Sequence, residues 1–431
     1  METGKAQRPL GLMMSISLVI GTMIGSGIYF QPSALAPLGW NMVIGWLISG
    51  LGALCLAITF RFLMDGTGEG IQHNIERITG EVPGFLAMFS YWAAGFASIA
   101  ALVIAGGSIL ADFLFEEPST SSGVVMAFIL LGLITAINLI GTRSAGRMQV
   151  LSVAIKIIPL LLVIGALTWF MLGSKPVQPM APAPVEIDGI SGAVALTLFA
   201  FLGFETASVP VNKIRNPERN IPIALIGGTS LVLVLYLLVS LGLMLLIPWQ
   251  DIASSTSPVS DALATVLGPV AGGLVALCIL VSVTGCANGL VLIGADCTYS
   301  MALRNEMPQL FARTSRDGVR YWGVIVQSVI VALFIIGNTS RGLSAMFTFL
   351  ALLTTGGILV FYFLAIVAAI KENRTVARWP VMAIGIAFTG LAIYGSGLEV
   401  GLWVFALLAI GLALRWYCRR SAVRVPAEGI A

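Results

Sequence analysis

Long apolar runs alternate with short polar segments along the whole chain, and these runs define the predicted architecture. A helix needs about 20 apolar residues to cross a bilayer, and most of the runs reach that length. The pattern therefore predicts an all-α integral membrane protein with twelve transmembrane helices. The predicted spans are 10–35, 40–63, 83–114, 123–141, 148–172, 189–211, 221–248, 267–302, 321–337, 343–370, 378–395 and 398–418.

Glycines interrupt the first span, where Gly21, Gly25 and Gly27 fall within seven residues. Each glycine costs a helix about 1 kcal/mol relative to alanine, and Pro32 removes one more backbone donor. A bilayer tolerates such a break only where protein or a cavity satisfies the backbone groups. The half-helix that begins there would present bare N–H groups and a positive dipole end, which suit a carboxylate. Close packing of a second helix on the glycines is the alternative interpretation.

A second interruption lies in the sixth span, where Glu205 follows Gly203 closely. The two breaks are about 180 residues apart, and each lies near the start of a block of five spans. The two blocks begin on opposite sides of the membrane, and paired breaks in inverted halves point to a binding site at the midplane. We therefore predict a 5+5 inverted repeat with broken helices 1 and 6. The expected units are 10–172, 189–370 and two additional helices in 378–418, within a single domain of residues 1–431.

Composition and charge support this class of protein. Hydrophobic residues make up 58% of the chain and charged residues only 10%, which excludes a water-soluble fold of this length. All but three of the 23 Lys and Arg residues fall on the side that holds the N-terminus; Lys175 and Arg341 lie opposite, and Lys156 lies within a span. The positive-inside rule then predicts cytoplasmic termini in the cell membrane. The first apolar run is too long for a signal-peptide core, so we expect it to remain as a helix.

Four stretches together resemble a known family. They are GTMIGSGIY (Gly21 to Tyr29), FLGFETASV (from Phe201), IRNPERNIPIA (from Ile214) and ALRNEMPQLFAR (from Ala302). The chain is similar to transporters of the amino acid–polyamine–organocation (APC) superfamily, nearest the basic amino acid/polyamine antiporter branch. The resemblance implies a LeuT-like/APC fold and a secondary active transporter of amino acids rather than an enzyme. It implies no cofactor, metal ion or nucleic-acid partner, and it indicates no particular oligomeric state.

The resemblance also implies where a substrate would bind. Its α-carboxylate would lie on the amides of Gly25, Ser26 and Gly27. Its ammonium would lie near carbonyls of Gly21 to Met23 and of Phe199 to Leu202. Ser98 and Asn288 are weaker pore-lining candidates, because polar residues are common in helix contacts. The predicted substrate-binding residues are Gly21, Thr22, Met23, Ile24, Gly25, Ser26, Gly27, Ser98, Phe199, Ala200, Leu202, Gly203 and Leu290.

Three ionisable residues lie within predicted spans, namely Lys156, Glu205 and Asp296, and we consider each for gating or coupling. Lys156 lies roughly 13 Å into its span, too deep to reach the surface easily. It matches a span 5 lysine that occupies a cation position in proton-dependent relatives, so it either couples transport to protons or bonds permanently to helix 1 carbonyls. Glu205 either takes part in gating or bonds free backbone amides. Asp296 is alternatively a structural partner of Arg304 or of another basic residue at the inner rim.

The substrate class stays open between neutral and cationic amino acids. Phe199 matches an aromatic position that covers the substrate of arginine-type exchangers, whereas Leu290 stands at their second aromatic position. Losing that ring removes a cation–π contact of about 0.5–2 kcal/mol. The expected activity is proton-coupled symport or amino acid exchange. The alternatives are a polyamine or cationic amino acid antiporter and a transporter-like sensor. A membrane enzyme is not expected, since one histidine and isolated carboxylates form no catalytic cluster.

Overall fold

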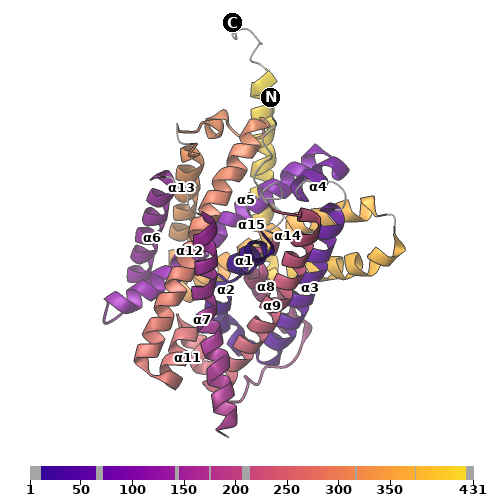
Figure 1. Ribbon diagram of the computed structural model, residues 1–431. Helices are drawn as coiled ribbons and strands as arrows, with labels where there is room; N and C mark the ends of the chain where they lie inside the picture. Colours follow the sequence, from indigo (N-terminus) through magenta and orange to yellow (C-terminus); the bar gives the residue numbers. More distant parts are fainter. Residues whose placement is uncertain are drawn as a thin grey trace.

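The protein forms a bundle of helices with α1, α2 and α8 near its centre (Figure 1). This computed structural model describes residues 11–64, 71–140, 145–173, 176–205, 214–315, 318–373 and 375–423. Residues 206–213 follow the second break and include the end of the stretch FLGFETASV. They lie outside the described residues.

Short connections join the helices in chain order. The main helices are α1 (Leu12–Met23), α2 (Gly27–Leu35), α3 (Trp40–Met64), α4 (Ile71–Thr79), α5 (Glu81–Leu114), α6 (Thr120–Ile140), α7 (Ala145–Leu172), α8 (Ile187–Phe201), α9 (Pro217–Leu246), α10 (Trp249–Ser254), α11 (Pro258–Leu267), α12 (Pro269–Leu303), α13 (Tyr321–Asn338), α14 (Leu343–Glu372) and α15 (Trp379–Val423). Short 3₁₀ turns η1 (Ala36–Leu38), η4 (Gln309–Ala312), η5 (Thr339–Arg341) and η6 (Val376–Arg378) lie between them.

Ten helical stretches in the described residues are long and apolar enough to cross a bilayer. The two remaining predicted spans are accounted for by geometry. Helix α8 has only 15 residues before it breaks, and α15 runs through two predicted spans with a non-helical residue, Gly397, between them. The all-helical membrane fold is therefore confirmed, while the count of twelve and the inverted repeat stay predictions.

Helix α5 lies in the core and packs against α6, α12 and α14. Small residues let helices approach one another closely around it. A Cβ on Gly107 would lie 2.5 Å from the carbonyl oxygen of Gly123, for example, so α5 and α6 meet backbone to backbone. Helix α3 packs on α8 in the same way, and Ser49 and Thr197 share a hydrogen bond of 2.8 Å there. These contacts hold the central helices in place around the two breaks.

The polar connections contain more helix than the hydrophobic pattern predicts. The segment 64–82 was expected as a loop, but it contains α4, whose Ile71 and Ile75 are buried one helical turn apart. The connection 249–266 contains α10 and α11. A search for apolar spans misses these helices because they are short or amphipathic. The Pro-rich segment from 176 to 186 has no regular secondary structure, and Gln178 donates its amide to the carbonyl of Leu245 at 3.0 Å.

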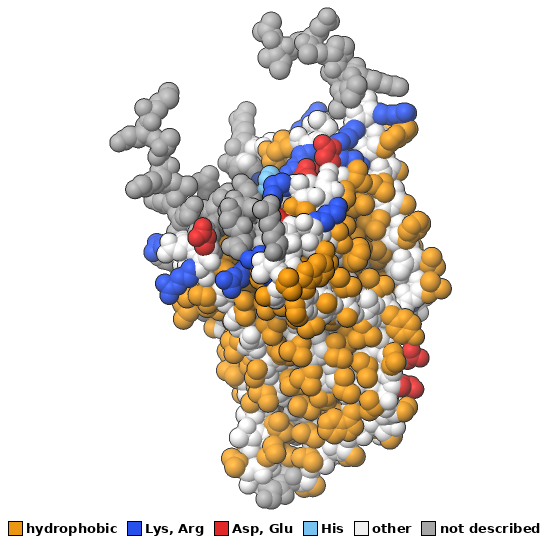
Figure 2. Space-filling view, turned by 90° about the vertical axis from the view of Figure 1, so that its right-hand side faces the viewer, with side chains coloured by type: hydrophobic (Ala, Val, Ile, Leu, Met, Phe, Trp, Pro, Cys, Tyr) orange, Lys and Arg blue, Asp and Glu red, His pale blue; other side chains and the backbone are white. Residues whose placement is uncertain are grey.

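Charged side chains gather at the end of the bundle that carries α4, above a broad hydrophobic band (Figure 2). We call this the α4 end. Ion pairs join several helices there. They are Arg77–Glu372 at 2.6 Å, Arg415–Glu306 at 3.1 Å, Arg419–Glu81 at 2.6 Å, Arg304–Glu76 and Arg320–Asp296. At the opposite end, Arg341 pairs with Glu399 at 2.5 Å.

Candidate functional site

The first break separates α1 from α2 at Ile24, Gly25 and Ser26. Helix α1 ends at Met23, and α2 begins at Gly27 with no side chain capping its N-terminus. Gly27 lies at a close approach, because a Cβ there would lie 2.7 Å from the Cα of Ala200 on α8. The glycines therefore do both things that the sequence suggested: they break the helix, and they allow a neighbouring helix to pack closely.

Side chains from two other helices donate to the last carbonyls of α1. Lys156 on α7 donates its Nζ to the carbonyl of Gly21 at 2.6 Å. Tyr236 on α9 donates its hydroxyl to the carbonyl of Met23 at 2.7 Å. These are two of the carbonyls that we expected to hold a substrate ammonium. The break is thus stabilised by protein donors on the side where α1 ends.

The N-terminus of α2 retains donors that the protein does not use. Among the described residues, the amides of Ser26 and Gly27 have no hydrogen-bond partner. The buried hydroxyl of Ser26 also has none within that part of the chain. The amide of Gly25, in contrast, donates to the carbonyl of Met23 at 2.8 Å. The unpaired donors at the start of α2 therefore come from Ser26 and Gly27.

The second break follows α8 and touches the first. Gly203 has a φ of +107°, a conformation that favours glycine, and a Cβ there would crowd Thr22 at 3.0 Å. The hydroxyl of Thr22 donates to the carbonyl of Gly203 at 2.9 Å, so one hydrogen bond joins the two breaks. Glu205 accepts hydrogen bonds through Oε2 from the Gly203 amide at 3.2 Å and from the Tyr362 hydroxyl at 3.0 Å. The buried carboxylate of Glu205 thus bonds the backbone of the break.

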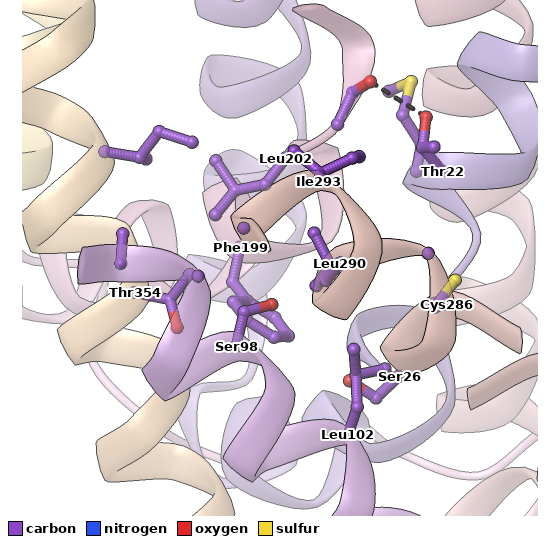
Figure 3. Close-up of a pocket in the computed structure, with 18 of the residues that line it drawn as sticks. Thr22, Ser26, Ser98, Leu102, Phe199, Leu202, Cys286, Leu290, Ile293 and Thr354 are labelled. Carbon is purple, nitrogen blue, oxygen red and sulfur yellow. Dashed lines mark hydrogen bonds between the residues drawn. The ribbon is translucent and has the colours of Figure 1, made fainter. Parts of the chain in front are cut away.

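A cavity of about 130 Å³ lies against both breaks. Its labelled lining residues point into one space from α1, α2, α5, α8, α12 and α14 (Figure 3). Most of its wall is apolar, and its polar groups come from a few side chains and from the broken backbone. The predicted residues that line it are Gly21, Thr22, Met23, Gly25, Ser26, Gly27, Ser98, Phe199, Leu202, Gly203, Leu290, Lys156 and Glu205.

Other predicted residues lie elsewhere. Ile24 is fully buried beside the cavity, and its carbonyl accepts a hydrogen bond from Ser282 at 3.4 Å. Ala200 packs against Gly27 rather than lining the cavity. Asp296 forms an ion pair at the α4 end with Arg320, one of the basic residues of that rim, while Arg304 pairs with Glu76. Asn288 accepts a hydrogen bond at 2.8 Å from Asn138 on α6 and is not a lining residue.

Several lining residues were not expected from the sequence. Helix α12 contributes a row of small residues to the cavity wall, and α5 and α13 contribute larger side chains. The row could have been found as glycines spaced four and five residues apart, whereas the others give no signal in sequence alone. These residues are Gly285, Cys286, Gly289, Gly294, Cys297, Tyr91, Trp92 and Gln327.

Lys156 is almost completely buried, with 2% of its surface exposed. Besides the carbonyl of Gly21, its Nζ contacts the sulfur of Cys286 on α12 at 2.9 Å. The hydroxyl of Tyr29 on α2 donates to the backbone carbonyl of Lys156 at 2.5 Å. This lysine therefore connects α7 to both halves of the first broken helix and to α12.

The arrangement brings hydrogen-bond donors and acceptors side by side in a mainly apolar cavity. The start of α2 offers donors and a positive dipole end, while the end of α8 offers carbonyls. Such a site offers hydrogen-bond partners to both ends of a small zwitterion. Among the residues that the structure describes, no group of three or more His, Cys, Asp or Glu could hold a metal ion.

Comparisons with known proteins identify the family. Residues 10–415 match the amino acid permease family model. The serine/threonine exchanger SteT of Bacillus subtilis is 30% identical over 71% of each chain. The putrescine transporter PotE of Escherichia coli is 26% identical over 94% of this chain and 95% of its own. A putative arginine/ornithine antiporter of Bacillus subtilis is 26% identical over 85% and 84%.

A solved structure shares the fold. MhsT in complex with L-phenylalanine superposes with a TM-score of 0.56 at 14% sequence identity, and the match covers 92% of this chain and 98% of that one. The family match spans both helix breaks and nearly all the described helices. The chain therefore belongs to the amino acid permease family of the APC superfamily, a family of membrane transporters and not of enzymes.

Proposed function

We propose that the protein carries an amino acid across the cell membrane by alternating access, with the zwitterion bound between the two helix breaks. The observation that carries this proposal is the start of α2. There, two unpaired amides and the unpaired hydroxyl of Ser26 border a cavity next to the carbonyl end of α8. Donors that are unpaired and buried in a protein need a partner, and a carboxylate at a helix N-terminus provides one.

In this proposal the carboxylate binds the amides of Ser26 and Gly27 and the hydroxyl of Ser26. The ammonium lies toward the last carbonyls of α8, from Ala200 to Leu202. The carbonyls of Gly21 and Met23 already accept hydrogen bonds from Lys156 and Tyr236, and that of Phe199 accepts one from the amide of Leu202. The ring of Phe199 covers the bound molecule from the side of α14. The sequence also placed the ammonium near the carbonyls of Gly21 to Met23, and the proposed site leaves those carbonyls out.

The proposed frame for transport has twelve spans in a 5+5 inverted repeat, followed by two additional helices. Residues 10–172 and 189–370 form its halves, and 378–418 the added pair. The concentration of basic residues at the α4 end supports a cytoplasmic location for that end and for both termini. The low charge and the apolar spans support the cell membrane as the location.

Coupling is proposed to run through Lys156, which contacts both α1 and α12 near the breaks. If the cavity opens and closes around this side chain, its hydration changes, and protonation can then favour one state over the other. Proton-coupled symport and amino acid exchange both fit this site. The relatives named as exchangers and antiporters support exchange.

A cationic substrate is the second candidate. The relative PotE is named a putrescine transporter, and the buried carboxylate of Glu205 borders the same cavity. A diamine lacks the carboxylate that the start of α2 would bind, so competition between an amino acid and putrescine separates the two substrate classes.

The function can be tested in liposomes that contain the purified protein. We expect uptake of at least one of radiolabelled L-serine, L-leucine and L-ornithine, and stimulation by unlabelled amino acid inside or by an inward proton gradient. Stimulation by internal amino acid alone indicates exchange, and stimulation by the gradient alone indicates symport. Uptake of putrescine but of no amino acid would contradict the zwitterion site. Binding without uptake would contradict transport and indicate a sensor.

A further inference from the structure

Gln327 on α13 reaches the central cavity from behind α12. Its side chain is 1% exposed and lines the cavity. The amide Nε2 donates to the carbonyl of Leu290 at 3.4 Å. Within the described part of the chain, the oxygen Oε1 has no hydrogen-bond partner. A buried acceptor without a partner is unfavourable, so this oxygen needs a donor from water or from a ligand.

Gly294 makes room for this carboxamide. A Cβ at position 294 would lie 2.0 Å from Oε1 of Gln327. Any residue other than glycine at this position would therefore displace the carboxamide. The contact with Leu290 also sets the orientation of the amide, because turning it over would place two oxygen acceptors against each other. The oxygen Oε1 is therefore the unpartnered acceptor of this side chain.

Small and apolar residues line the cavity wall between the helix breaks and Gln327. Cys286 on α12 lies beside the first break, since a Cβ on Gly25 would be 3.6 Å from its sulfur. Gly294 follows Cys286 by eight residues, or about 12 Å along the helix axis. Gly289 and Leu290 line the cavity between them. The lining of α12 is therefore continuous from the first break to the position that faces Gln327.

We propose that Gln327 and Gly294 form a subsite that takes the hydrogen-bond donor at the far end of the substrate's side chain. This inference rests on the proposed zwitterion site, from which the side chain would extend. The chemical class is an α-amino acid with an apolar stem and a terminal ammonium or hydroxyl. The carboxylate of Glu205 borders the same cavity and favours the ammonium.

Two matched pairs of probes test the subsite with the purified full-length protein. L-ornithine differs from L-norleucine only in a terminal ammonium for a methyl, and L-homoserine differs from L-norvaline in a hydroxyl for a methyl. We expect the wild-type protein to bind the donor-ended member of each pair about tenfold more tightly, as measured by calorimetry. Gln327→Leu should remove about tenfold in affinity for the donor-ended members and leave the apolar members unchanged or improved.

A second variant and a matched control separate this effect from misfolding. Gly294→Ala leaves Gln327 in the chain but displaces its carboxamide, and it should lower the same preference. Ser328→Ala changes the neighbouring residue on α13, whose hydroxyl contacts Thr135 at 2.8 Å instead of the cavity, and should keep the preference. If Gln327→Leu does not fold, Gly294→Ala carries the test.

Three outcomes overturn the subsite. Equal wild-type affinities within each pair would show that Oε1 accepts no hydrogen bond from the end of the substrate's side chain. A preference that survives both Gln327→Leu and Gly294→Ala would assign it to another group. If the wild-type protein binds none of the four probes, the proposed amino acid site fails and the subsite fails with it. Binding of L-norleucine without any preference overturns the subsite alone, so the two failures are distinguishable.

Discussion

At the scale of single residues, Gly25 tests the space at the first break. A Cβ there meets Cys286 and Leu102 at 3.6 and 3.7 Å, which is ordinary contact, and the residue needs no left-handed backbone. Alanine therefore fits, whereas the two further methyls of valine occupy the space in which the substrate would lie. We expect Gly25→Val to weaken amino acid binding at least tenfold while the melting temperature changes by only a few degrees.

Gly25→Ala is the matched control for that variant and should retain most of the affinity. Calorimetry for binding and thermal denaturation for stability can be measured on the same three samples. Wild-type affinity in a well-folded Gly25→Val protein would show that the substrate does not approach this position.

Phe199 tests the other wall of the cavity. Its ring meets Phe347 edge to face, with 6.0 Å between centroids, and Phe347 in turn contacts Phe30 at 5.5 Å. These rings lie on the side of the cavity away from the α4 end. We expect Phe199→Ala to reduce transport at least tenfold, because bound substrate loses apolar contact and water enters. Phe199→Trp should retain more activity.

Measurements of stability and affinity together decide the role of this ring. A phenylalanine that only packs would cost about 3–5 kcal/mol of unfolding free energy when truncated and leave affinity nearly unchanged. That pattern, in place of a loss of affinity, would contradict a substrate-covering role for Phe199.

Sequence reasoning at this scale found the residues whose chemistry is local. The glycines of the first break and Gly203 were recognisable because they are clustered, or followed closely by a carboxylate, inside an apolar span. Cys286 and Gln327 were not, since their importance depends on which helix faces them. Lys156 was conspicuous as a charge inside an apolar span, but its contact with the sulfur of Cys286 needs the packing of α7 against α12.

At the scale of elements, Lys156 links α7 to α1 and α12 through its contacts with Gly21 and Cys286. We expect Lys156→Ala to reduce transport strongly and to abolish stimulation by a proton gradient. The carbonyl of Gly21 also loses its donor, at a cost of about 1–3 kcal/mol. Initial rates of uptake into proteoliposomes, with and without the gradient, measure both effects.

Lys156→Met separates the charge from the packing, because it keeps a chain of similar length without a titratable group. It should resemble Lys156→Ala in its pH response while retaining more stability. If either variant keeps wild-type rates and the same response to the gradient, Lys156 is not the coupling residue, and its bond to Gly21 is structural.

The predicted elements agree with the structure where the hydrophobic signal is long. The central spans begin and end within a few residues of α3, α5 and α12, because a bilayer requires a long apolar helix whatever its neighbours are. Helices α4, α10 and α11 were missed, since short amphipathic segments are stabilised by contacts that only the assembled bundle provides. The helix breaks were found because the bilayer makes an interrupted backbone costly.

At the scale of the whole molecule, the two ends of the bundle differ in charge and in how they are closed. Ion pairs such as Arg77–Glu372 and Arg415–Glu306 join helices at the α4 end. Burial raises the pKa of Glu306, and hydrogen bonding to Arg415 opposes that shift. Aromatic contacts through Phe347 lie between the cavity and the opposite end. Alternating access would require the contacts at the two ends to loosen in turn.

The orientation of the molecule follows from the same asymmetry and can be tested directly. Helix α3 starts beside the segment 176–186, since a Cβ on Gly39 would lie 2.4 Å from the carbonyl oxygen of Ala181, and it ends next to α4. Exposed residues Val177 and His73 therefore mark opposite ends of the bundle. In the proposed orientation, His73 lies on the cytoplasmic side.

A membrane-impermeant maleimide should distinguish these two positions in intact cells. We expect Val177→Cys to be labelled from outside, because the Pro-rich segment carries little positive charge and lies at the end away from α4. His73→Cys should be labelled only after the membrane is permeabilised. The parent protein corrects for its five native cysteines, of which Cys286 borders the cavity. The reverse pattern would invert the proposed orientation. Labelling of both positions from outside would place them on the same side of the membrane. The number of spans between them would then have to change by an odd number, which would overturn the predicted arrangement of spans.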